Sequence, residues 1–228
     1  MTLAGPLPHN PLFLFGALLT IIFYVCALWL RKKIRWVHPL IAASAAIILV
    51  LKAGGLSYET YQAGADMVSW ALGPATVALA VPLYKHAALI RRRLAPVLTG
   101  ITVGALISAA STACMIAMSG ASAELLYSAI AKSSSAPFSM AVAARQGGIP
   151  ELAASLSVLT GLFGSLAGPA FLRICGIKDD LSVGAAIGTS SHGIGTARLM
   201  SYSEKQGSVS GFAMAAAGII TTVAMMLV

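Results

Sequence analysis

The sequence predicts an all-α, polytopic membrane protein of about seven to eight spans, with interrupted helices and two structural halves. Three observations lead to this class: 58% of the 228 residues are apolar, only 10% are charged, and the mean hydropathy is +0.87. Soluble domains have roughly 45–50% apolar and 25% charged residues, so we expect the apolar excess to face lipid. We expect a single membrane domain over residues 1–228, with halves of about 10–120 and 121–228.

Charge-free apolar runs locate the expected spans, because a membrane-spanning helix needs about 20 predominantly apolar residues. The runs that supply spans directly are 10–30, 67–84, 96–120, 152–172, 181–197 and 206–228. The run 38–51 is counted as a short span, since Lys52 can extend its charge to the interface. The first run ends in basic residues without a small-residue cleavage site, so we expect it to stay in the membrane.

The run 122–144 leaves two alternatives open, because Lys132 lies in its middle. If the run crosses the membrane, the chain has eight spans and the two halves run parallel. If it dips in and returns, the chain has seven spans and the halves are inverted. Paired interrupted segments in two halves are typical of transporters with inverted repeats, and we expect such repeats here.

The net charge is +8, and we attribute it to basic residues that orient the protein in the membrane. Basic residues cluster at 31–35 and 85–93, each time between apolar runs, which is the pattern of cytoplasmic loops under the positive-inside rule. This distribution excludes a nucleic-acid partner. Three cysteines, an odd number, do not predict a disulfide framework. Since no Cys or His spacing suits a metal, we expect no metal and no cofactor.

The first candidate binding segment is 131–137, AKSSSAP, which includes Lys132, Ser133, Ser134, Ser135 and Pro137. A charge near the bilayer centre costs roughly 2.5–3.5 kcal/mol, so Lys132 is expected to face the protein interior or a wet cavity. The serines and the proline weaken the helix and free backbone groups. Such a set suits a small carboxylate. The alternative is that Lys132 reaches an interface and the serines bond to their own helix.

The second candidate segment is 188–198, GTSSHGIGTAR. Its glycines do not favour a regular helix, so we expect an unwound stretch. The candidate substrate-binding residues are Ser191, His192, Thr196 and Arg198, and the candidate backbone-lining residues are Gly193 and Gly195. His192 is suited to hydrogen-bond an anion or carry a proton. Alternatively, His192 makes a helix-to-helix hydrogen bond and Arg198 is a charge at a helix end.

A third segment, with Gly73, Pro74 and Thr76, predicts a broken helix without a charge, which serves as a hinge or as backbone lining. The sequence has no pair of carboxylates at helical spacing within a span, no phosphate-binding loop and no nucleophile elbow. It therefore predicts no enzymatic activity and no catalytic residues.

Glycines also recur at four-residue spacing. The pairs are Gly100 and Gly104, Gly164 and Gly168, Gly184 and Gly188, and Gly207 and Gly211. In membranes this spacing lets helices approach closely. We expect packing within one subunit, and a homo-oligomer seam is left open as the alternative.

Several stretches together resemble the LrgB/CidB family of bacterial membrane proteins, over nearly the whole chain. The matching stretches are 72–84 (LGPATVALAVPLY), 131–141 (AKSSSAPFSMA), 147–150 (GGIP), 188–198 (GTSSHGIGTAR) and 218–221 (GIIT). The chain departs from the family at Ser135-Ala136, where two threonines often precede the proline.

The resemblance implies a multi-pass protein of the bacterial inner (cytoplasmic) membrane, related to transporters with crossing, broken helices. Family members are named holin-like or antiholin-like modulators of murein hydrolase activity and autolysis, acting with a small LrgA/CidA-type membrane partner. Others, including a fused plastid relative, resemble carriers of small monocarboxylates such as glycolate, glycerate or pyruvate. We therefore expect a carrier or export component for a small carboxylate, and the alternative is the holin-like or antiholin-like role.

Overall fold

The computed structural model describes residues 12–34 and 37–227, without the side chains of Leu12, Phe13, Leu72 and Thr76. All regular structure in these ranges is α-helical, which confirms the predicted class. The chain forms two compact units, residues 1–78 and 79–228, which are described separately. The expected single domain, with halves at about 10–120 and 121–228, stays a prediction.

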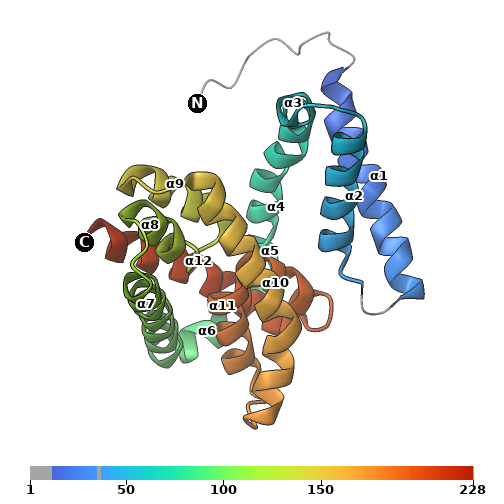
Figure 1. The fold of residues 1–228 in the computed structure, drawn as a ribbon. Helices are drawn as coiled ribbons and strands as arrows, with labels where there is room; N and C mark the ends of the chain where they lie inside the picture. The colour runs from blue at the N-terminus through green and yellow to red at the C-terminus, as the bar shows by residue number, and fades with distance from the viewer. Residues whose placement is uncertain (1–11, 35–36, 228) are drawn as a thin grey trace. The chain divides into compact units, whose positions relative to one another are not determined.

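The helices of each unit follow the chain in order (Figure 1). Unit 1 contains α1 (Leu12–Lys33), α2 (Pro39–Ala53), α3 (Tyr58–Trp70) and α4 (Leu72–Ala78). Unit 2 contains α5 (Ala80–Lys85), α6 (Ala87–Arg92), α7 (Leu94–Met118), α8 (Ala123–Ala131), α9 (Ala136–Gln146), α10 (Pro150–Ile174), α11 (Asp180–Met200) and α12 (Glu204–Met226).

Several helical segments of the described chain are long and apolar enough to cross a membrane. They are Leu14–Lys33, Tyr58–Lys85, Leu94–Met118, Pro150–Ile174 and Glu204–Met226, with Pro39–Ala53 as a shorter apolar helix. Their outer faces carry large apolar side chains, such as Phe163 and Ile174 of α10, which are 74% and 84% exposed. The chain is therefore a membrane protein. The count of seven to eight spans and the inverted repeats stay predictions.

Unit 1 is organised around α1, which packs against both α2 and α3. At the α1–α3 contact the Thr20 hydroxyl hydrogen-bonds the Tyr61 hydroxyl at 2.9 Å. Gly16 faces the backbone of α3 so closely that a Cβ atom would collide with the Tyr61 carbonyl. Pro39 starts α2 and Ser57 caps α3, as expected from the preference of these residues for helix starts.

In unit 2 the long helices α7 and α12 share an apolar contact. It is formed by Val97, Ile101 and Ala105 of α7 with Ala213 and Ala217 of α12, all buried. Small side chains on α12 let the two helices approach closely, which is the usual basis of helix association in lipid. This contact forms one side of the scaffold that holds the candidate site.

Residues 123–146 form a helical hairpin, called hairpin 1, made of α8, the turn 132–135 and α9. The chain returns alongside itself, because the Ile149 N–H donates to the Ser128 hydroxyl at 2.7 Å. The arms have 9 and 11 residues, or about 14 and 17 Å, well short of the roughly 30 Å hydrocarbon core. The run 122–144 is therefore a hairpin of two short helices and not one continuous spanning helix, while the number of spans and the inverted repeats stay predictions.

Helix α11 is also a hairpin, called hairpin 2, with arms 180–191 and 193–200 and its tip at His192. The tip residue has φ 49° and ψ −134°, which is not helical. Ile187 and Leu199, twelve positions apart, share one apolar cluster, whereas a straight helix would separate them by about 18 Å. The run 181–197, expected as a full span, is therefore not one, because the chain reverses at His192.

The glycine pairs pack mainly within unit 2. At Gly184 a Cβ atom would lie 2.7 Å from Val209 Cβ of α12, and at Gly168 it would lie 2.6 Å from Ile187 Cδ1 of hairpin 2. Gly100 has open space around it, and at Gly104 only Thr189 lies within contact distance. The glycines of hairpin 2 and α10 thus serve the packing within one subunit that we expected.

Gly188→Ala is expected to lower the free energy of unfolding by about 1–3 kcal/mol, the usual effect of overpacking. The added Cβ would collide with the Ser210 carbonyl of α12, and a backbone atom there cannot turn aside. Gly211→Ala is the matched control, since its Cβ would lie 3.8 Å from Thr196 Cγ2, an ordinary contact. Thermal unfolding of the two purified variants in detergent measures the difference, and equal Tm values would contradict the close contact.

Candidate functional site

Unit 2 contains a cavity of about 530 Å³ between α7 and the first arm of hairpin 2. One end is lined by Arg93, Asp179 and Ser182, which are exposed. The opposite end is lined by Ser133 and His192, which are buried. The cavity is therefore open beside the starts of α7 and α11 and has a buried floor.

Helix α7 and the first arm of hairpin 2 form the walls of the cavity. Gly100, Gly104 and Ser108 lie successively deeper on α7, and Ala185 and Thr189 do so on hairpin 2. From residue 94 to residue 108, α7 rises roughly 20 Å. Glycine and alanine keep the walls wide, so the cavity reaches from the helix starts into the middle of the unit.

The floor lies where the tips of the two hairpins meet. The Ser133 hydroxyl of hairpin 1 is 3.1 Å from the Ser108 hydroxyl of α7. His192, at the tip of hairpin 2, is 4% exposed, and its ring lies next to the backbone of Lys132 and within electrostatic range of the Lys132 ammonium. The structure thus brings together the two segments that were singled out separately in the sequence.

The imidazole of His192 is incompletely satisfied. Its Nδ1 atom is buried and has no hydrogen-bond partner among the described residues. Buried polar atoms in proteins almost always have a partner, from protein or water. A buried, unpaired nitrogen beside a cavity is therefore a place where a ligand or water can bind.

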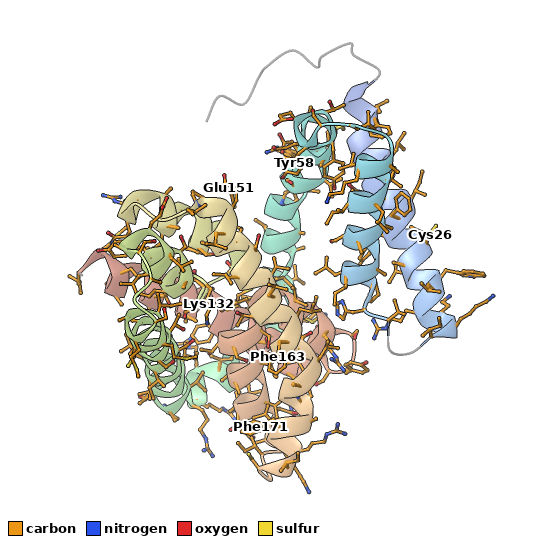
Figure 2. All side chains as sticks on the ribbon, viewed as in Figure 1. Cys26, Tyr58, Lys132, Glu151, Phe163 and Phe171 are labelled. Atoms are coloured by element: carbon orange, nitrogen blue, oxygen red, sulfur yellow. The ribbon has the colours of Figure 1, made fainter. Side chains whose placement is uncertain are left out.

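Lys132 ends α8 at the tip of hairpin 1 (Figure 2) and is half-buried. It forms no ion pair within the described part of the chain. It is near His192 but is not among the residues that line the cavity. Its ammonium can therefore act on the floor through its charge.

The other serines of hairpin 1 hold its tip in place. Ser134 is fully buried, donates to the Ala131 carbonyl at 3.0 Å, and accepts at its own carbonyl from the Ser157 hydroxyl at 2.5 Å. Ser135 occupies the N-cap position of α9 without a capping bond from its side chain, and Pro137 lies in the first turn of that helix. None of the three lines the cavity.

Hairpin 2 places its remaining candidates in packing contacts. Ser191 is buried against Gly164 of α10, and Gly195 is packed against Ile187 of the first arm. The fully buried Thr196 hydroxyl makes two hydrogen bonds of 2.8 Å, to the His192 carbonyl and to the Ser210 hydroxyl. Gly193 is exposed next to the tip. Ser191 and Thr196 therefore hold the hairpin, and neither lines the cavity.

The remaining predicted residues lie outside this cavity. Arg198 donates to the Ser165 carbonyl and lines a second cavity. Gly73 and Pro74 are exposed on α4 of unit 1, after the expected helix break at Ala71. The side chain of Thr76 lies outside the described residues.

Sequence reasoning did not name seven polar cavity residues, of which the last two lie in the second candidate segment: Arg93, Ser108, Thr160, Asp179, Ser182, Thr189 and Ser190. Ser108 and Thr160 are single hydroxyls in apolar runs, which usually bond back to their own helix. The arrangement Asp179-x-x-Ser182 was detectable as a helix cap, although a cap does not by itself indicate a cavity.

Asp179 is held at the open end by the start of α11. Its carboxylate accepts hydrogen bonds of 3.0 Å from the backbone N–H and the hydroxyl of Ser182. The backbone N–H of Ser182, together with the positive charge of Arg93, holds the pKa of Asp179 below its ordinary value of 3.8. The carboxylate is therefore ionised at neutral pH.

Asp179→Asn is expected to lower thermal stability slightly at pH 7 and to have no effect in acid. Because the pKa is lowered in the folded state, this carboxylate stabilises the protein above its unfolded pKa and loses that contribution as the pH falls through the folded pKa. Unfolding of wild type and variant in detergent from pH 7 downward measures this, with Ser182→Ala as a control for the hydroxyl contact. A Tm difference that stays constant with pH would contradict an ionic contribution.

The fold and the cavity define a class: a polytopic α-helical membrane protein with a polar site at the tips of two helical hairpins. The LrgB-like family model matches residues 20–228, and the chain belongs to that family.

The matches to related proteins cover most of the chain. A Bacillus subtilis protein, uncharacterized protein YxaC, is 32% identical over 89% of this chain and 89% of its own length. A Staphylococcus epidermidis protein named holin-like protein CidB is 28% identical over 90% and 91%. A Bacillus mycoides protein named antiholin-like protein LrgB is 26% identical over 92% of each. No solved structure matches the chain.

Proposed function

We propose that this protein carries a small organic anion, of the two- or three-carbon monocarboxylate class, across the bacterial inner membrane. The observation that carries the proposal is the buried floor of the cavity, where hydroxyls, an imidazole and a nearby ammonium converge at two hairpin tips. Interrupted helices whose tips meet inside the membrane are how many secondary carriers build their substrate sites. No catalytic role is proposed for these residues.

Each group at the floor has a defined task in this proposal. Ser133 and Ser108 hydrogen-bond the carboxylate. The other ring nitrogen of His192 bonds the Lys132 backbone, so the unpaired Nδ1 accepts a proton carried with the anion and, once protonated, donates to the carboxylate. Lys132 attracts the anion by its charge. In this proposal Ser134 and Thr196 act as supports: the Ser134 carbonyl binds hairpin 1 to Ser157 of α10, and the Thr196 hydroxyl binds hairpin 2 to Ser210 of α12.

A second function is favoured by the names of the relatives. Holin-like protein CidB and antiholin-like protein LrgB point to a modulator of murein hydrolase activity and autolysis, working with an LrgA/CidA-type membrane partner. Such an assembly passes larger or less selective cargo and uses oligomers. The contacts of Gly184 and Gly168 within unit 2 leave these glycines less free to form a seam between subunits.

A counterflow assay in proteoliposomes, with and without an LrgA/CidA-type partner, distinguishes a selective carrier from a holin-like assembly that passes unselective cargo. A panel of two- and three-carbon acids is expected to give saturable exchange for one class of anion, with no leak of unrelated dyes. Passage of dyes and unrelated ions at comparable rates would refute the carrier and favour the holin-like function.

A further inference from the structure

A second cavity of about 440 Å³ lies between the end of α10 and the second arm of hairpin 2. Three cations line it, Arg173, Lys178 and Arg198, and no acidic side chain does. Within the described residues none of the three forms an ion pair; the nearby Asp180 pairs with Lys205 and accepts a hydrogen bond from Gln206 of the cavity lining. The cavity lining therefore carries three positive charges and no negative one.

Local structure explains why these cations share one cavity. After α10 the chain turns at Gly176, whose φ of 73° is left-handed, and the Ile177 N–H donates to the Leu172 carbonyl at 2.9 Å. This tight reversal returns Lys178 toward the last turn of α10, where Arg173 lies. Arg198 arrives from the second arm of hairpin 2, anchored at the Ser165 carbonyl by one nitrogen, which leaves its other donors available.

The wall of this cavity is apolar. It includes Pro169, Leu172, Val183 and Leu199. On the same part of α10, Phe171, which is labelled in Figure 2, is 64% exposed and Ile174 is 84% exposed, as expected of a face toward acyl chains. The cavity lies at the end of the candidate span Pro150–Ile174, where a helix that crosses the bilayer would meet the lipid headgroups.

We propose that this second cavity binds the phosphate of an anionic phospholipid headgroup, with the lipid chains along the end of α10. Basic pockets between membrane helices on the cytoplasmic side bind such headgroups, and Arg presents a planar fork of donors that suits phosphate oxygens. The combination of three cations and an apolar wall matches a lipid better than a free anion. This site is separate from the cavity between α7 and hairpin 2 and does not depend on the proposed transport function.

Calorimetric titration of the detergent-purified full chain tests the site. The probes are dioctanoyl-phosphatidylglycerol, dioctanoyl-phosphatidylcholine with the same chains but a neutral headgroup, and inorganic phosphate. We expect saturable binding of the phosphatidylglycerol, much weaker binding of the phosphatidylcholine, and weaker binding of phosphate. If inorganic phosphate binds as tightly as phosphatidylglycerol, the ligand of this cavity is a soluble anion, and the proposal of a lipid is refuted.

The variant Arg173→Gln/Lys178→Gln is expected to bind phosphatidylglycerol roughly 25-fold more weakly, since each Lys or Arg near an anionic lipid contributes about fivefold. Arg91→Gln/Arg92→Gln is the matched control, because it removes the same charge from exposed positions on α6 that line neither cavity. Lys178→Gln alone, at an exposed position, is the second variant should the double variant not fold. Equal weakening by test and control variants would show only general charge attraction and refute the site.

Discussion

His192→Gly is expected to reduce anion uptake at least about tenfold while leaving thermal stability unchanged or higher. The imidazole is the group with an unpaired nitrogen at the cavity floor, and a hydrogen bond to a charged partner contributes about 1.5–3 kcal/mol. The backbone at this residue, φ 49° and ψ −134°, is one that glycine adopts freely and that costs other residues about 1–3 kcal/mol. Glycine thus removes the imidazole and its contact with the Lys132 backbone while keeping the backbone conformation of the tip of hairpin 2.

The measurement is uptake by proteoliposomes together with Tm in detergent. Ser191→Ala is the control, since Ser191 neighbours His192 but is packed against α10 and does not line the cavity. We expect the control to retain uptake. If folded His192→Gly takes up the anion at the wild-type rate, the imidazole is not part of the binding site. A large loss of thermal stability would contradict the claim that the backbone at residue 192 is strained.

Gly100→Phe is expected to block uptake while the protein still folds. Gly100 lines the cavity, and no atom lies within contact distance of where its Cβ would be. A phenyl group there projects into the passage between the open end and the floor, without the overpacking that destabilises a filled core. We expect uptake to fall at least about tenfold, with a lower maximal rate, because entry is obstructed and the floor itself is unchanged.

Val103→Phe on the same helix is the control for adding a phenyl ring to α7. Val103 is 49% exposed and does not line the cavity, so its replacement is expected to leave uptake and Tm unchanged. Uptake by Gly100→Phe at the wild-type rate would mean that the anion does not pass through this cavity. The variant thus tests the route separately from the groups that bind.

The membrane class and the two polar segments were predictable from the sequence. Long charge-free runs, broken by AKSSSAP and GTSSHGIGTAR, indicate lipid-facing helices with weak points. Local chemistry contributes to this, because glycine, serine and proline are weak helix formers, although α10 stays continuous through Pro169. Of the unwound stretch expected at 188–198, the structure has a single non-helical residue, His192, between two helical arms.

The direction of the chain after each break was not predictable. Residues 181–197 have nearly the length and apolarity of a span, yet they reverse at His192. Hydropathy gives the environment of a run but not its path, since one arm of a hairpin and one half of a span have the same composition. The reversal depends on contacts between residues far apart in sequence, such as Thr196 with Ser210.

The sequence by itself determined that this is a membrane-spanning helical protein and which two segments interrupt its helices, because both follow from the local preference of side chains for lipid or for irregular backbone. Only the tertiary structure decided which hydroxyls face the cavity. Ser133 and Ser134 are adjacent and chemically identical, yet Ser133 lines the floor and Ser134 is fully buried with its hydroxyl donated to its own helix. That difference depends on how the hairpin tip is rotated against α7 and α10, which long-range packing determines.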